Sequence, residues 1–355
     1  MNTQNILALA LKPAMRVTKS VGIGIVLFLA AALIAIITPS AASAQSPCEP
    51  TATRLVTGLD TGLESAKGST VGPDGALYVT EGAVGRISRV DPLTGEVTTF
   101  ANGLPTAIIS IGGAIIGGAI DVAFIDNIAY ALVTLVSPDV GGSHVDGIYR
   151  VDGPDSFTVV ADIGQFNLDN PPTIPFPYFI RTGLQYALQT YRGGFLVTDA
   201  HLNRVLRVAL DGEISVFIAF DNIVPTGLEV RGNTVYMDEA GADPHVPQDG
   251  KVVSFGPRSP TATEVASGNP FLLDVEFDGG GRLYALSHGT VDPLRDPSNA
   301  QPNTGALVKV NEDGTFTVIT DGLDRPTSLE FIGNTAYFVT LTGEIWKIDG
   351  VSCPH

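Results

Sequence analysis

The sequence is poor in several residue types that carry chemistry in other proteins. Its 355 residues include only two cysteines, one tryptophan and five histidines. It contains neither a Gly-x-Ser-x-Gly nor a His-Glu-x-x-His motif, so nucleophile-elbow hydrolases and zincin metalloproteases are disfavoured. The glycine-rich segment 111–120 has no lysine and no following helix, which argues against a phosphate-binding loop.

Basic residues are also scarce. Twenty lysines and arginines stand against 37 acidic residues, giving a formal net charge of −17. Such a surface repels nucleic acid and anionic lipid, so we expect no nucleic-acid partner. Cations, neutral ligands and basic partners fit better. The apolar fraction of 44% with 16% charged residues predicts a folded chain.

The N-terminal segment has the features of an export signal. Three basic residues, Lys12, Arg16 and Lys19, precede an uninterrupted apolar run over residues 21–37, and Ala42-Ser43-Ala44 fits a cleavage site. We predict a signal peptide over 1–44, one domain over 45–355, and a secreted or periplasmic protein without a stable membrane span after cleavage. The alternative is an uncleaved anchor, because seventeen apolar residues could just span a bilayer.

The two cysteines, Cys48 and Cys353, lie at opposite ends of the predicted mature chain. An even count in an exported protein favours a disulfide, which would require the two ends to meet. Two unpaired terminal thiols are the alternative. The disulfide would point to a closed ring.

Between the ends, one pattern of four short strands recurs six times. In residues 181–221 a Gly-Gly turn and an Asp-Gly turn separate β-rich runs, which is typical of hairpins. The copies span Ser69–Phe100, Ile120–Asp162, Arg181–Asp221, Pro225–Gly268, Leu273–Gly322 and Pro326–Asp349. The last copy lacks an outer strand, and Thr53–Gly58 resembles the outer strands of the other copies.

The repeats predict an all-β fold, a six-bladed β-propeller whose last blade is closed by the N-terminal strand. The second-strand position recurs about every 52 residues, at Tyr78, Tyr130, Leu196, Tyr236, Tyr284 and Tyr337.

One face of this propeller carries every long link. The insertions are 102–119, 136–147, 164–181, 240–250 and 287–305, and all follow a second or fourth strand. Long links tend to be functional, so we expect a small molecule, glycan or protein to bind the loop-rich face. Four of the five histidines, His144, His201, His245 and His288, follow second strands on that face.

Acidic residues at the ends of second strands are candidate metal ligands. These are Glu81, Asp199 and Glu239, with Asp274 on an inner strand. Carboxylates suit Ca²⁺, and added imidazole suits another divalent metal. The remaining candidates for the binding face are Asp121, His144, Thr182, Thr226, Asp238, His245 and Thr327. The alternative is that these polar residues are solvated or bond neighbouring loops.

Three segments, 68–82, 224–241 and 272–289, resemble the ScyD/ScyE family of exported bacterial propellers, named from gene clusters for the pigment scytonemin. The resemblance implies a six-bladed fold and an extracytoplasmic location. The sequence is also similar to gluconolactonase-like propellers, which hold a divalent metal with Glu, Asn and Asp side chains. The acidic ligands of that site could correspond to Glu81, Asp199 and Asp274. Its asparagine ligands have no counterpart, because Thr182 and Thr226 stand where asparagines are expected.

Three kinds of function remain open, one of them a structural role in a surface assembly, where the acidic shell would keep the protein soluble. Another is a binding or interaction module without catalysis, which the missing catalytic motifs favour. The third is a metal-dependent, gluconolactonase-like hydrolase or lyase with an acidic site at the channel mouth. In that case His201 or His288 would be the candidate base.

Overall fold

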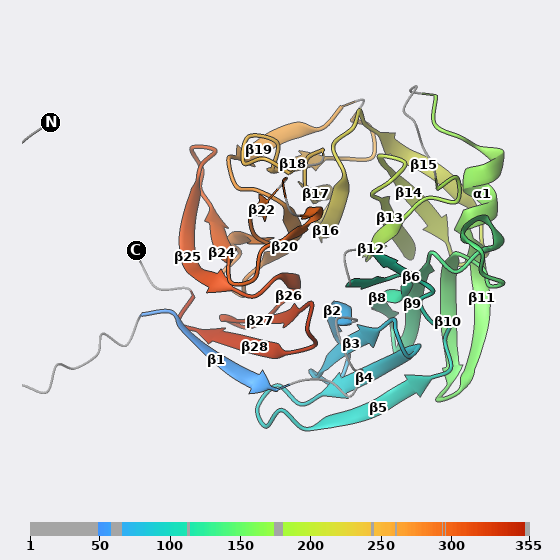
Figure 1. Cartoon of the computed structure of the whole chain (residues 1–355), viewed down its shortest axis with the longest axis horizontal. Coiled ribbons are helices and arrows are strands. Elements are labelled where there is room, and N and C mark those ends of the chain that lie inside the picture. The colour runs from blue at the N-terminus through green and yellow to red at the C-terminus, as the bar shows by residue number, and fades with distance from the viewer. Residues whose placement is uncertain are drawn as a thin grey trace, which may run out of the picture. The chain divides into compact units, whose positions relative to one another are not determined.

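Six four-stranded antiparallel sheets arranged in a ring form the fold, as Figure 1 shows. The computed structural model describes residues 49–57, 66–111, 114–173, 180–242, 245–259, 261–292, 294 and 296–351. The six-bladed β-propeller predicted from the repeats is therefore confirmed. The predicted signal peptide and the two cysteines, Cys48 and Cys353, lie outside the described residues.

Each blade runs from an inner strand at the axis to an outer strand at the rim. The first comprises β2 (Ala66–Val71), β3 (Leu77–Glu81), β4 (Arg86–Val90) and β5 (Val97–Asn102). The second comprises β8 (Gly118–Ile125), β9 (Ile128–Thr134), β10 (Gly147–Gly153) and β11 (Ser156–Asp162). The third comprises β12 (Gln185–Tyr191), β13 (Gly194–Asp199), β14 (Arg204–Ala209) and β15 (Ile214–Ala219).

The remaining blades follow the same order. The fourth comprises β16 (Pro225–Arg231), β17 (Thr234–Glu239), β18 (Lys251–Phe255) and β19 (Thr263–Ser267). The fifth comprises β20 (Leu272–Phe277), β21 (Leu283–Ser287), β24 (Gly305–Val310) and β25 (Phe316–Leu323). The sixth comprises β26 (Pro326–Ile332), β27 (Thr335–Thr340), β28 (Ile345–Asp349) and β1 (Thr51–Val56).

The sixth blade takes its outer strand from the N-terminal part of the chain, as predicted. β1 pairs antiparallel with β28, and Thr51 lies opposite Asp349. Figure 1 shows the blue strand beside the red one. Val56 at the end of β1 is buried against Tyr337, Val339 and Ile345. The two ends of the described chain thus close the ring.

The repeated second-strand tyrosine explains how neighbouring blades pack. Its ring contacts a phenylalanine on the inner strand of the next blade in three cases, with ring centroids about 5 Å apart. The pairs are Tyr78 with Phe124 (4.8 Å), Tyr236 with Phe277 (5.1 Å) and Tyr284 with Phe331 (5.0 Å). Such pairs add about 0.5–1.5 kcal/mol each beyond area burial.

The long links lie at the ends where second strands finish and inner strands begin, on one face. Several carry regular structure that the sequence reading missed. These are the hairpin β6 (Ile109–Ile111) with β7 (Ala114–Ile116), the 3₁₀ turn η1 (Pro138–Val140), helix α1 (Ile163–Asp169), and the hairpin β22 (Val291–Asp292) with β23 (Asp296–Ala300). Neither described helix has the length and apolarity to cross a bilayer.

Removing β1 tests the closure of the ring. A chain that begins at residue 58 exposes the edge of β28 and loses the burial of Val56. We expect its free energy of unfolding to fall by about 3 kcal/mol or more, because strand hydrogen bonds and apolar burial are both lost. Urea unfolding checks this, with a chain beginning at Glu49 as control. Equal midpoints for the two chains would show that β1 does not close the ring.

Candidate functional site in the central channel

The six inner strands surround a cavity of about 210 Å³ on the ring axis. Its wall carries four carboxylates, Asp121, Asp274, Glu276 and Glu330, and one lysine, Lys67. Thr327, another predicted face residue, also lines it. Of the candidate residues on inner strands, Asp121, Asp274 and Thr327 line this one cavity, whereas Thr226 is not among its lining residues.

Asp121 and Asp274 occupy equivalent places on β8 and β20. The Asp121 carboxylate accepts hydrogen bonds from the backbone N–H of Val122 (2.8 Å) and of Leu188 on β12 (2.6 Å). Asp274 accepts from Val275 (3.0 Å) and from Leu329 on β26 (2.7 Å). Each aspartate therefore joins its own inner strand to that of the next blade.

Glycines let these aspartates fit between strands. A Cβ atom on Gly68 would lie 2.2 Å from Oδ1 of Asp121, and one on Gly227 would lie 2.6 Å from Oδ1 of Asp274. Burial raises the pKa of Asp121 well above its ordinary value and that of Asp274 to about 7, although the backbone N–H groups oppose the shift.

Further along the channel, one level carries three glutamates on consecutive blades. Glu229, Glu276 and Glu330 each lie opposite the second-strand tyrosine of their own blade. The equivalent residues of the first three blades are neutral: Thr70, Ala123 and Gln189. Gln189 donates from Nε2 to the Glu229 carboxylate (2.7 Å). The acids therefore gather on one side of the channel.

The pKa values of all three glutamates are raised. Burial is the main cause, and it brings the pKa of Glu229 to about 7. For Glu276 and Glu330 the pKa lies well above the ordinary value, because neighbouring carboxylates add like-charge repulsion to burial. The cavity is therefore a place where carboxyls hold protons near neutral pH.

Tyr186 crosses the channel at its loop-rich end. Its hydroxyl, on β12 of the third blade, donates to the backbone carbonyl of Thr327 on β26 of the sixth blade (3.3 Å). These inner strands lie on opposite sides of the ring. Burial and the nearby carboxylates raise the tyrosine pKa well above its ordinary value, so the hydroxyl keeps its proton. The cavity extends from Tyr186 past Gln189 to Thr190 at the other end of β12.

The predicted metal ligands on the second strands lie apart from this cavity. The Glu81 carboxylate forms a two-point ion pair with Arg86 (2.9 and 2.8 Å) and accepts a hydrogen bond from Ser88. Asp199 accepts four hydrogen bonds, from the backbone of Leu184 and Leu202 and the side chains of Asn167 and Gln185. Both carboxylates already bind protein donors.

A basic neighbour is the feature common to Glu81, Asp199 and Glu239. Each lies opposite a basic residue on the third strand of its own blade, namely Arg86, Arg204 and Lys251. Within the described residues, no group of three or more His, Cys, Asp or Glu side chains is placed to hold a metal ion. The expectation that these acids would share one coordination sphere is therefore not met.

The four predicted histidines do not converge. His144 is exposed on its loop, and His201 accepts a hydrogen bond from the backbone N–H of Ile180 (3.2 Å). His245 stacks on Phe271 with ring centroids 3.9 Å apart, and His288 meets the same phenylalanine edge-on at 4.9 Å. Two of the four thus share one buried aromatic cluster.

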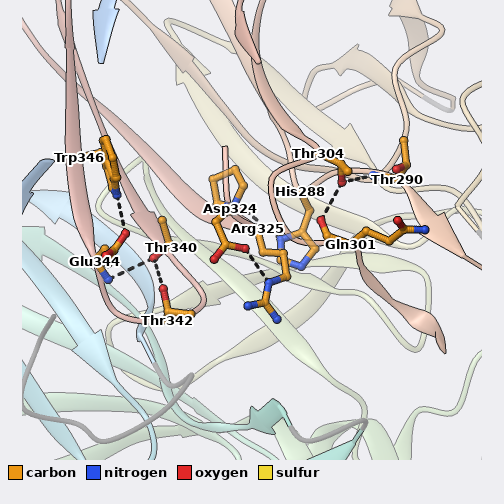
Figure 2. A network of polar contacts seen from close by, with 11 residues as sticks. His288, Thr290, Gln301, Thr304, Asp324, Arg325, Thr340, Thr342, Glu344 and Trp346 are labelled. Atoms are coloured by element: carbon orange, nitrogen blue, oxygen red, sulfur yellow. Dashed lines mark hydrogen bonds and ion pairs between the residues drawn. The ribbon is translucent and has the colours of Figure 1, made fainter. Parts of the chain in front are cut away.

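Burial weakens the candidate bases. Nδ1 of His288 donates to the carbonyl of Pro326 (3.0 Å), and burial lowers the pKa of its ring to about 4. Figure 2 shows His288 beside Arg325, which donates to Asp324 (2.9 Å), and Thr304 bonded to Thr290 and Gln301. Burial also lowers the pKa of His201.

The remaining predicted face residues have structural contacts. Thr182 lies 3.2 Å from the hydroxyl of Ser137. Thr226 lies within hydrogen-bond distance of the carbonyls of Asp238 and Leu272 (3.1 and 2.9 Å). Asp238 is buried with neither carboxylate oxygen hydrogen-bonded, and burial raises its pKa well above the ordinary value.

The sequence reading missed Glu229, Glu276, Glu330 and Tyr186. A signal for the glutamates was present, since Leu-Glu-Val, Val-Glu-Phe and Leu-Glu-Phe recur in the inner strands of three consecutive repeats. Nothing distinguished Tyr186 from an ordinary strand residue.

Comparison with protein-family models finds no match, and no curated protein matches the chain. Solved structures do resemble it. A gluconolactonase from Xanthomonas campestris is 12% identical, with a TM-score of 0.56, over 84% of this chain and 89% of that one. The aldose sugar dehydrogenase of Streptomyces coelicolor in its PQQ-bound form is 16% identical, with a TM-score of 0.52, over 85% and 98%.

A catalytically inactive virginiamycin B lyase from Staphylococcus aureus with quinupristin is 15% identical, with a TM-score of 0.51, over 84% and 99%. At these identities the likeness shows the propeller fold alone. The ScyD/ScyE resemblance gains no support from it beyond the fold.

Glu81 tests the structural role of the second-strand acids. Glu81→Gln removes the charge that faces Arg86, so we expect the free energy of unfolding to fall by about 2–4 kcal/mol. Urea unfolding in EDTA measures this. Glu96→Gln, on an exposed site, is the control and should change stability little. The ligand role would be favoured instead by a different result. In that case Glu81→Gln would leave the free energy of unfolding in EDTA unchanged and would abolish a stabilisation that added metal gives the wild-type protein.

The channel acids predict how stability depends on pH. A carboxyl whose pKa is higher in the folded than in the unfolded state binds its proton more tightly when folded, so stability falls as pH rises from its unfolded to its folded pKa. For Glu229 that window runs from about 4.5 to about 7. Glu229→Gln should remove up to about 3 kcal/mol of this loss. Urea unfolding at pH 5 and pH 8 checks it, and a variant with the wild-type difference between the two pH values would contradict it.

Proposed function

We propose that this chain is an exported propeller that binds a small cation or hydrogen-bond donor in its central cavity and does not transform it. The observation that carries the proposal is a polar cavity on the ring axis whose carboxylates outnumber its bases by four to one. Asp121, Asp274, Glu276 and Glu330 offer acceptors, and Lys67 is the single basic side chain on the described wall.

The raised pKa values support a positive ligand. A cation that enters the cavity relieves the repulsion among Asp274, Glu276 and Glu330, and it exchanges with the protons that they hold. Binding is then coupled to proton release. The negative net charge of the whole chain also attracts cations to the molecule.

The absence of catalysis rests on how the candidate residues are used. The carboxylates of Glu81 and Asp199 bind protein donors, and His288 has a pKa of about 4, far below that of an effective base at neutral pH. Export rests on the N-terminal sequence, and a link to secondary-metabolite pathways rests on the ScyD/ScyE resemblance.

A metal-dependent hydrolase or lyase is the second candidate. It is favoured by one observation, the pKa of Asp274, which at about 7 suits a general base that faces a cavity. Its substrate class would be a small ester or lactone, by analogy with the gluconolactonase fold. Turnover of a lactone panel that is abolished in Asp274→Asn, at unchanged ligand binding, would establish this candidate over the first.

Ligand-induced stabilisation tests the binding proposal. We expect Ca²⁺ or 1,4-diaminobutane to raise the unfolding midpoint more at pH 8 than at pH 5, because protons compete for the same carboxylates. A ligand at a hundred times its Kd adds about 2.7 kcal/mol. Glu276→Gln combined with Glu330→Gln should abolish the shift.

The matched control has the same loss of charge on exposed sites, Glu96→Gln with Glu312→Gln. It should keep the full shift. Equal shifts in both double variants would assign the effect to the general surface charge and refute the cavity site.

A further inference from the structure

In the first and third blades, protein donors hold the acid at the end of the second strand by hydrogen bonds, and the fourth blade differs. In the first blade the acid at the end of the second strand is paired with the base opposite it, Glu81 with Arg86. In the third blade Asp199 accepts four hydrogen bonds. In the fourth blade Lys251 lies opposite Glu239, but its Nζ donates to Glu264 on β19 instead (2.8 Å).

Within the part of the chain that the structure describes, the ion pair of Lys251 is therefore with Glu264 and not with Glu239. The exposed fraction of Glu239 is 7%, yet no hydrogen bond or ion pair joins its carboxylate to another described residue. Burial raises the pKa of this carboxyl to about 7, with Lys251 opposing the shift and Glu264 adding to it. Because Glu239 lines an open groove, a cation there can reach its carboxylate and supply hydrogen bonds that the described residues do not.

The carboxylate lies in a surface groove of about 420 Å³ at the junction of the third and fourth blades. Phe220 and Ile223 come from the link between the blades, and Val253 and Ala262 come from the fourth blade. Asp221, Lys251 and Glu264 lie along the same groove. The Glu264 carboxylate accepts hydrogen bonds from Lys251 and from the hydroxyl of Ser267 (2.8 Å each), so the ammonium group of the lysine is engaged by Glu264.

We propose that this groove binds a primary ammonium ion carried on an aromatic or branched hydrocarbon body, with Glu239 as the counter-ion. The ammonium supplies the hydrogen bonds that the Glu239 carboxylate lacks, and the apolar body contacts Phe220, Ile223 and Val253. An aromatic wall beside a carboxylate also favours a cation, because the ring face attracts positive charge. A neutral alcohol of the same shape would leave the carboxylate charge uncompensated.

This site is separate from the central cavity, since the two share no lining residue. The inference therefore does not depend on the proposed function, and each can fail alone. The Glu276→Gln, Glu330→Gln double variant should bind an aryl ammonium in the groove as the wild-type protein does.

Calorimetric titration of the whole protein with phenethylammonium chloride tests the proposal. We expect binding to the wild-type protein, and a Kd about tenfold or more higher for Glu239→Gln, because a charge-assisted hydrogen bond is lost. 2-Phenylethanol should bind the wild-type protein about tenfold more weakly than the ammonium. Glu213→Gln, an exposed site on the third blade, makes the same charge change and should bind normally.

Phe220→Ala is a second test, and it leaves the charge of Glu239 in place. It should weaken binding of the ammonium because it removes one apolar wall of the groove. Circular dichroism confirms that each variant is folded before titration. No binding to the wild-type protein overturns the proposal. Equal Kd values for Glu239→Gln and Glu213→Gln overturn it as well.

Discussion

The convergence of six inner strands on one axis is the constraint on which the rest of the molecule depends. Closing the ring requires every blade to place its first strand at the centre, and β1 on β28 completes that closure. Side chains that would reach solvent on an ordinary exposed strand then face one another across a narrow cavity. Asp121 and Asp274 use this by accepting backbone hydrogen bonds from the neighbouring inner strand. The same aspartates that join the blades therefore supply the charge of the cavity.

The destabilisation caused by buried carboxyls is concentrated in one half of the ring. Blades four to six carry Glu229, Glu276 and Glu330 at one level, whereas the equivalent residues of the first three blades are neutral. Three carboxyls with raised pKa values oppose stability as they ionise. A protein of marginal stability keeps such a group most readily where a ligand compensates it. The three glutamates thus distinguish one half of the ring from the other among otherwise similar repeats.

The architecture could be predicted from the sequence because it repeats. Three features of the sequence agree on six blades. They are the turn signals, the tyrosine that recurs at the position of Tyr78, and the missing outer strand of the sixth repeat. The site was harder, since a glutamate within Leu-Glu-Val resembles a solvent-facing strand residue until the channel is built. Glu81 and Asp199 have the residue type and strand position expected of metal ligands, but donors from other elements, such as Arg86 and Asn167, occupy their carboxylates. Which strand faces the channel, and which acid meets a base, are decided by the ring rather than by local sequence.

The measurement that tests this account most directly is the number of protons released when a cation binds near pH 7. Calorimetric titration of the folded protein with Ca²⁺ or 1,4-diaminobutane in two buffers of different ionisation enthalpy gives that number. If protonated carboxyls form the cavity wall, binding releases roughly one proton or more per ligand, and the Glu276→Gln, Glu330→Gln double variant releases fewer. Binding without proton release, or equal release by the double variant, would contradict the account.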